Sequence, residues 1–121
     1  MAKKILVVDD EAPTRELLAL FFRQQGYQVG TLSCGSTVLQ ELEKNPCDLM
    51  VLDVDLGDAN GIDLLLPIKK ARPSLPVIIF TGINFDEEIV QRARQNGASG
   101  FLGKTQPLDE MLKEVQRLLG T

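Results

Sequence analysis

The run Asp48-Leu49-Met50-Val51-Leu52-Asp53 decides how the rest of the chain is interpreted. Its four consecutive apolar residues are too few for a helix, and the run is bounded by Asn45-Pro46 before it and Gly57 after it. These features predict a strand that is buried on both faces, as in the centre of a parallel sheet. In open α/β sheets, ligands bind beyond the carboxyl ends of the strands, so Asp53 lies where a functional site is expected.

The size and charge of the chain limit its architecture and its classes of partner. Its 121 residues suffice for one domain with a substantial core, and 44% hydrophobic and 25% charged residues are typical of globular proteins. The net charge of −4 argues against general binding of nucleic acid or of an anionic membrane. The first apolar run ends at Asp9, too early for a signal peptide, and no run approaches the ~20 residues of a membrane helix. We therefore expect a cytoplasmic protein without direct contacts to nucleic acid or membrane.

The sequence contains no histidine and two cysteines, Cys34 and Cys47, which do not form a CxxC motif. This composition argues against a zinc site, and we expect both cysteines to be reduced thiols. A catalytic triad based on histidine and a phosphohistidine within this chain are excluded for the same reason.

Other short apolar runs alternate along the chain with amphipathic segments. Pro67 lies within one expected helix and should either kink it or mark its first turn. Strict alternation of strands and helices predicts an α/β domain with a parallel sheet and helices on both faces. The expected strands are 5–8, 27–33, 48–53, 77–81 and 101–102, and the expected helices are 13–26, 36–44, 62–71, 86–96 and 108–119.

The strand order determines which acidic residues meet. A doubly wound order such as 2-1-3-4-5, with right-handed crossovers, places the first and third strands side by side. Their ends are then ~4.8 Å apart, which brings Asp9, Asp10 and Asp53 into one pocket. Two carboxylates at ~4 Å repel by about 4 kcal/mol at an effective dielectric constant near 20, so three of them require a proton or a cation. An all-oxygen set of ligands favours a hard ion, and carboxylates with water are typical of Mg²⁺.

The other strand ends add a hydroxyl, Thr81, and an ammonium group, Lys104. Together with the carboxylates and a divalent ion, these groups form a site for a phosphoryl group. Mg²⁺ and Lys104 would offset the charge on its oxygens, and Thr81 would donate a hydrogen bond to one of them. Asp53, at the centre of the pocket, can act as the nucleophile and form an aspartyl phosphate.

Over essentially its full length, 1–121, the chain resembles a receiver domain of a bacterial two-component response regulator, which has a flavodoxin-like (βα)5 fold with strand order 2-1-3-4-5. Each matching motif is weak alone, but together, at successive strand ends and in the family's order, they are specific. The matching residues are Ile5-Leu6-Val7-Val8-Asp9-Asp10-Glu11, Leu52-Asp53, Gly61, Phe80-Thr81-Gly82, Gly97-Ala98 and Phe101-Leu102-Gly103-Lys104.

The resemblance implies a role for each residue of the expected site. Asp53 is then the phosphoacceptor, and Lys104 is the counter-ion of the phosphoryl group. Asp9, Asp10 and Asp53 are implied as Mg²⁺ ligands, together with the backbone carbonyl of Asp55.

The resemblance also implies a switch and a set of partners. Thr81 is implied as the hydroxyl that moves onto the phosphoryl group, and Phe101 as the aromatic residue whose inward rotation reports phosphorylation. Phe101 as an ordinary core residue remains open. The expected function is phosphorelay signalling rather than conventional enzyme catalysis. The expected partners are a sensor histidine kinase or phosphotransfer protein and an output protein or fused output domain; a homodimer through the fourth helix, fifth strand and fifth helix is compatible with the pattern.

The chain departs from the family pattern at several positions. Lys104 is followed by Thr105 where the family usually has proline, often after a cis bond; a cis bond before another residue costs roughly 2.5–4 kcal/mol, which favours a trans bond here. Gly57 replaces the usual proline of the following loop, and Asn60 stands where aspartate is common. Asp55 is an acid where many relatives have a neutral residue.

Three other functions remain to be weighed. The first is a pseudo-receiver, which has the receiver fold but is not phosphorylated and acts only as a protein-interaction module. Asp53-Val54-Asp55 resembles the nucleophile and acid of haloacid-dehalogenase-type phosphatases, but in that family the motif ends the first strand. Residues 98–105 fit a relaxed P-loop pattern, yet they contain the apolar pair Phe101-Leu102 and precede Pro107, which argues against nucleotide binding.

Overall fold

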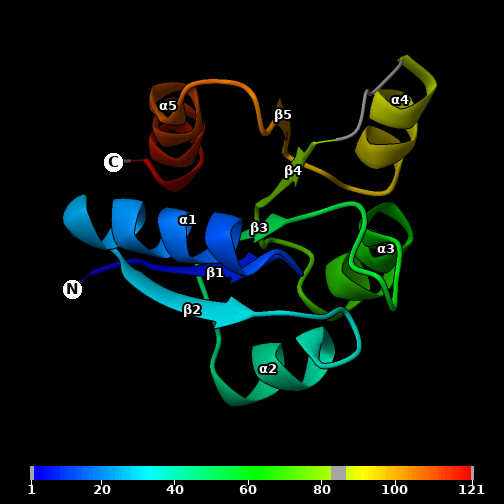
Figure 1. Cartoon of the computed structure of the whole chain (residues 1–121). Helices are drawn as coiled ribbons and strands as arrows, with labels where there is room; N and C mark the ends of the chain where they lie inside the picture. Colours follow the sequence, from blue (N-terminus) through cyan, green and yellow to red (C-terminus); the bar gives the residue numbers. More distant parts are fainter. Residues whose placement is uncertain (1, 83–86, 121) are drawn as a thin grey trace.

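The computed structural model describes residues 2–82 and 87–120, and these form one parallel sheet with helices on both faces (Figure 1). The strand order is β2-β1-β3-β4-β5, which confirms the predicted α/β class and topology. The strands are β1 (Lys4–Val8), β2 (Gln28–Leu32), β3 (Leu49–Leu52), β4 (Val77–Thr81) and β5 (Gly100–Gly103). The helices are α1 (Ala12–Gln24), α2 (Val38–Lys44), α3 (Gly61–Ala71), α4 (Glu87–Gln95) and α5 (Leu108–Leu119).

The central strands are wholly apolar because both of their faces are covered. Side chains alternate along β1, so Ile5 and Val7 face α1 and α5, whereas Leu6 and Val8 face α2, α3 and α4. Figure 1 shows the same two layers of helices. Each large side chain that is fully buried in these layers contributes roughly 1.5–3 kcal/mol relative to an exposed one. The sheet is therefore a rigid support for the residues that follow its strands.

One predicted helix start is wrong by two residues, and one of two alternatives for Pro67 is excluded. Helix α2 begins at Val38 rather than Ser36: the Val38 amide closes a tight turn on the Gly35 carbonyl, and the helical hydrogen bonds begin with the Glu41 amide and the Thr37 carbonyl. Pro67 lies in the interior of α3 and not in its first turn. The expected first residue of α4, Asp86, lies outside the described residues.

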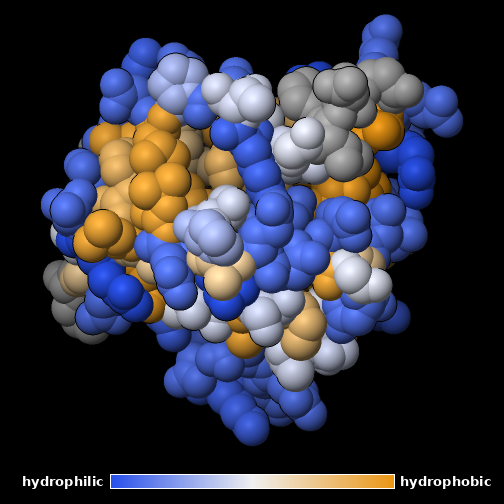
Figure 2. All heavy atoms as spheres, viewed as in Figure 1, coloured by the Kyte–Doolittle hydropathy of each residue, from blue (hydrophilic) through white to orange (hydrophobic). Residues whose placement is uncertain are grey.

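The burial of β2 and the geometry of one peptide bond agree with the sequence-based expectations. Strand β2, at the edge of the sheet, is only partly buried, as its mixed sequence predicts. Within residues 2–82 and 87–120 no peptide bond is cis, so Lys104-Thr105 is trans. None of the helices described is both long and apolar enough to cross a membrane. Apolar side chains gather in the region of α1 and α5 (Figure 2), and on α1 Leu17 and Leu20 are more than half exposed.

Candidate functional site

The acidic and basic residues singled out in the sequence follow neighbouring strands at one edge of the sheet. Strand β1 ends immediately before Asp9, and β3 ends immediately before Asp53. The two strands pair with Val8 opposite Leu52, so these acids emerge side by side. On the other flank of β3, Thr81 is the last residue of β4 and pairs with Gly103, the residue before Lys104. The parallel register thus brings residues from four strands to one end of the domain.

Lys104 is the centre of the ionic contacts at this edge. Its Nζ atom lies 2.8 Å from Glu11 Oε1, 3.0 Å from Asp9 Oδ2 and 3.1 Å from Asp53 Oδ2. The side chains of Asp9 and Asp53 are 2% and 6% exposed, and that of Glu11 is 62% exposed. A single ammonium group therefore bridges two buried carboxylates and one carboxylate at the rim.

These contacts perturb the proton affinities of the two central groups. Burial raises the pKa of Asp53 to about 6; the hydrogen bond from Lys104 opposes this shift, and the charge of Asp9 adds to it. Burial alone would lower the pKa of Lys104, but its hydrogen bonds to Glu11, Asp9 and Asp53 outweigh burial and raise the pKa above its usual value. The lysine consequently stays charged at neutral pH, and Asp53 is predominantly ionised there.

The same acids fit the requirements of a hard metal ion. Asp9, Asp10, Glu11 and Asp53 each offer a carboxylate oxygen, and these oxygens lie within 4.8 Å of one another. Mg²⁺ prefers such all-oxygen ligands and usually retains several waters. The cluster can therefore hold a divalent cation, provided that the Lys104 ammonium yields some of its carboxylate contacts.

A surface cavity of about 550 Å³ opens above this cluster. Thr81 contributes to its lining and is itself buried, with 1% of its surface exposed. Phe101 lies three residues before Lys104 on β5, where it is half-buried and packs against the core on the face of α2, α3 and α4. The residues that line the cavity are Asp10, Glu11, Asp53, Asp55, Thr81, Gly82 and Lys104.

The loop between β3 and α3 is held by its own polar side chains. Asp55 Oδ1 accepts a hydrogen bond from the Gly57 amide at 3.2 Å. Asn60 caps α3, because its Oδ1 atom accepts from the amides of Ile62 at 2.8 Å and Asp63 at 3.3 Å. A Cβ atom at Gly61 would overlap the Asp53 carbonyl, so only glycine allows the helix to start this close to Asp53.

Sequence reasoning gave no role to two residues that the structure connects to the site. Glu11 contacts Lys104 through its carboxylate, and its amide donates to Asp9 Oδ1 at 2.9 Å. Asp58 ties the β3–α3 loop to Gly35 and Ser36 of the β2–α2 loop. The first contact has a sequence signal, a third acid beside the Asp9-Asp10 pair. The second has none, because Asp58 and Gly35 are far apart in the sequence and neither belongs to a motif.

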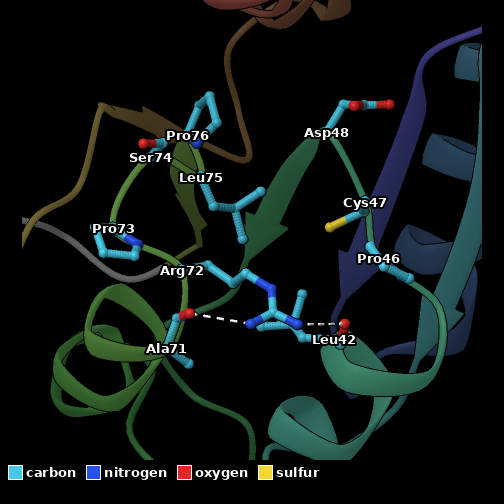
Figure 3. A pocket seen from close by; sticks show the side chains of 10 residues that line it. All are labelled: Leu42, Pro46, Cys47, Asp48, Ala71, Arg72, Pro73, Ser74, Leu75 and Pro76. Atoms are coloured by element: carbon cyan, nitrogen blue, oxygen red, sulfur yellow. Dashed lines mark hydrogen bonds between the residues drawn. The ribbon is translucent and has the colours of Figure 1, made fainter.

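A second cavity, of about 440 Å³, lies at the other end of the strands, where β3 and β4 begin (Figure 3). The Arg72 guanidinium extends into the space between α2 and α3 and donates to the backbone carbonyls of Ala71 at 3.0 Å and Leu42 at 3.2 Å. The Asp48 carboxylate accepts from the Lys4 amide at 2.8 Å. The charged groups of this cavity are thus engaged with the backbone, and its remaining walls are mainly proline and leucine. The cluster around Asp53 is the stronger candidate site.

Comparison with known proteins identifies the family of the chain. The family model of the response regulator receiver domain matches residues 5–116. The chain belongs to this family. The receiver domain is 36% identical over 115 residues to the DNA-binding transcriptional regulator NtrC of Rhizobium meliloti (strain 1021). The matched region covers 95% of this chain and 24% of NtrC. The chain therefore spans about a quarter of the length of that relative.

Solved structures show the same fold. A CheY-like response regulator receiver domain protein from Methanospirillum hungatei JF-1 superposes with a TM-score of 0.93 at 25% identity, covering 99% of this chain and 95% of that protein. NtrX from Brucella abortus gives a TM-score of 0.90 at 32% identity over 99% of this receiver domain, but over only 27% of NtrX.

Proposed function

We propose that this receiver domain accepts a phosphoryl group on Asp53 in a Mg²⁺-dependent phosphorelay. The observation that carries the proposal is the bridge from the Lys104 ammonium to Asp9 and Asp53, which combines a nucleophile, a fixed positive charge and metal-binding acids in one cavity. The donor would be a sensor histidine kinase, a phosphotransfer protein or a small phosphodonor.

In the proposed reaction, an Asp53 carboxylate oxygen attacks the phosphorus atom while the bond to the donor breaks, and the leaving group keeps the bonding electron pair. With a pKa of about 6, Asp53 is mostly in the nucleophilic form at neutral pH. Lys104 would exchange a carboxylate contact for a phosphoryl oxygen, and Thr81 would donate a hydrogen bond to another. Asp9, Asp10 and Asp53, with the backbone carbonyl of Asp55, would hold Mg²⁺, which supplies charge neutralisation at the phosphoryl oxygens.

Phosphorylation would be read on the face formed by α4, β5 and α5. Thr81 and Phe101 are the residues through which the change would travel, because Thr81 lines the cavity and Phe101 lies on the neighbouring strand. The output would come from a partner protein or a fused domain, and the same face is available for homodimerisation. The similarity to NtrC, a DNA-binding transcriptional regulator, makes transcriptional output our specific expectation.

Intact-mass analysis after incubation with Mg²⁺ and acetyl phosphate tests the proposal. The parent should gain the mass of one phosphoryl group in an acid-stable, base-labile form, and Asp53→Asn should gain none. Asp109→Asn, which removes an equivalent charge from the exposed first turn of α5, is the matched control and should behave as the parent. A parent that stays unmodified would favour a pseudo-receiver, and sustained hydrolysis of free phosphate esters would favour a phosphatase.

A further inference from the structure

The contacts of the Lys104 ammonium leave none of its hydrogen-bond donors free. An ammonium group has three N–H donors, and here three carboxylates lie within 3.1 Å of Nζ. Two of them, Asp9 and Asp53, have roles in the proposed phosphoryl transfer. A new ligand that takes an N–H donor of Lys104 must therefore displace one of these contacts.

The third partner, Glu11, has a different environment. It is the residue before α1, yet its side chain makes no capping hydrogen bond to the helix. Instead it reaches Lys104, 93 residues along the chain. Because the Glu11 side chain is 62% exposed, water can solvate its carboxylate without help from the lysine. The buried carboxylates of Asp9 and Asp53 have much less access to water.

Because of this difference in exposure, the contact with Glu11 affects where the Lys104 side chain lies more than it stabilises the folded protein. Ion pairs with an exposed member typically contribute only ~0–1 kcal/mol. The contact nevertheless restricts the flexible side chain of Lys104, because Glu11 offers its ammonium a partner at one place on the rim of the cavity. Glu11 thus offers Lys104 a partner at the rim that the ammonium can keep when it releases Asp9 or Asp53.

We propose that Glu11 is a positioning residue for Lys104, keeping its ammonium at the rim when Asp9 and Asp53 exchange the lysine for other ligands. The inference rests on the proposed phosphoryl-acceptor function, because it concerns the same cavity. With Glu11 present, the lysine keeps one carboxylate partner while it turns its other donors toward a phosphoryl group. Without Glu11, the ammonium has no other carboxylate to keep when it releases Asp9 or Asp53, so it competes more strongly with Mg²⁺ for their oxygens.

A double-mutant cycle in Mg²⁺ affinity, measured by titration calorimetry with MgCl₂ alone, tests this inference. The four proteins are the parent, Glu11→Ala, Lys104→Met and the double variant. Glu11→Ala should weaken Mg²⁺ binding about fivefold when Lys104 is present, within the coupling range for residues in contact, and less than about twofold in the Lys104→Met background. Lys104→Met alone should strengthen Mg²⁺ binding, because it removes the competing cation.

Glu16→Ala is the matched control, since it removes an exposed acid of the same charge from α1 and should leave Mg²⁺ affinity within about twofold of the parent. Circular dichroism establishes that every variant is folded. An equal loss of affinity in both backgrounds would overturn the inference, because Glu11 would then act on the cation directly. Unchanged affinity in Glu11→Ala, or no Mg²⁺ binding by the parent, would overturn it too.

The same proteins separate this inference from the proposed function. If acetyl phosphate labels Asp53 of the parent but the cycle shows no coupling, the positioning role fails and the function stands. If the coupling is present but Asp53 is never phosphorylated, the function fails and the link between Glu11 and Lys104 stands.

Discussion

Replacing Asp53 by asparagine should stabilise the metal-free protein, although it removes the proposed phosphoacceptor. The Asp53 side chain is 6% exposed and lies 3.1 Å from the Lys104 ammonium. Burial raises its pKa from 3.8 to about 6 in spite of this contact, and the neighbouring charge of Asp9 contributes to the increase. Ionised Asp53 is therefore less favourable in the folded chain than in the unfolded chain.

The sign and size of the effect follow from the linkage between proton binding and folding. Because the pKa is higher in the folded state, the folded protein binds the proton more tightly, and stability falls as the pH rises from about 4 through about 6. A shift of about two pH units corresponds to roughly 3 kcal/mol above pH 7, or a change in Tm of roughly 10 °C for a chain of this size. Asparagine carries no charge and can still accept a hydrogen bond from Lys104, so Asp53→Asn should remove this destabilisation.

Thermal unfolding followed by circular dichroism in EDTA measures the effect. At pH 8 the Tm of Asp53→Asn should exceed that of the parent by roughly 10 °C, and at pH 5 by about half as much. Glu16→Gln, an exposed change of the same charge, should shift Tm by less than about 2 °C at either pH. A lower Tm for Asp53→Asn at pH 8, or a larger increase at pH 5 than at pH 8, would refute the electrostatic argument.

Three further predictions concern the two cysteines and the start of α3. Burial raises the pKa of Cys47 to about 11, whereas hydrogen bonds with neighbouring hydroxyls lower the pKa of Cys34. Alkylation at pH 7.5, followed by peptide mass mapping, should therefore label Cys47 at least about 100-fold more slowly than Cys34. Comparable rates of labelling would contradict this. Asn60→Ala should lose about 1 kcal/mol of unfolding free energy in urea, because the cap of α3 is removed, whereas Asn60→Asp should retain it. Gly61→Ala should lower the Tm by more than Asn60→Ala does, because the added methyl group overlaps the Asp53 carbonyl; an equal Tm would show that this close approach is not required.

The order of elements could be predicted because burial leaves a simple signal in the sequence. A strand covered on both faces must be apolar throughout, as Leu49–Leu52 is, and an amphipathic helix such as α5 repeats its apolar residues with helical spacing. Element boundaries depend on contacts that no local pattern records. Helix α2 starts only after a tight turn at Gly35, and α3 continues through Pro67 although proline removes a backbone donor there.

The candidate site shows the same division. Parallel register alone places Asp9 beside Asp53, so their proximity follows from the strand order. The partners of Lys104 do not follow from it, because a long side chain can reach several acids and its choice depends on distances within the folded protein. The contact with Glu11 and the raised pKa of Asp53 both depend on such distances and on burial, which the order of the strands does not determine.

The distribution of the site along the chain has a consequence for how the protein is made. The acids follow the first and third strands of the domain in sequence order, whereas their positively charged partner follows the fifth strand, which is an outer strand of the sheet. During synthesis, β1 and β3 can pair and bring Asp9 and Asp53 together before Lys104 has left the ribosome. The nascent domain must then tolerate uncompensated repulsion, which docking of the final βα unit relieves. Neutralisation of charge thus couples completion of this fold to the synthesis of its β5–α5 segment.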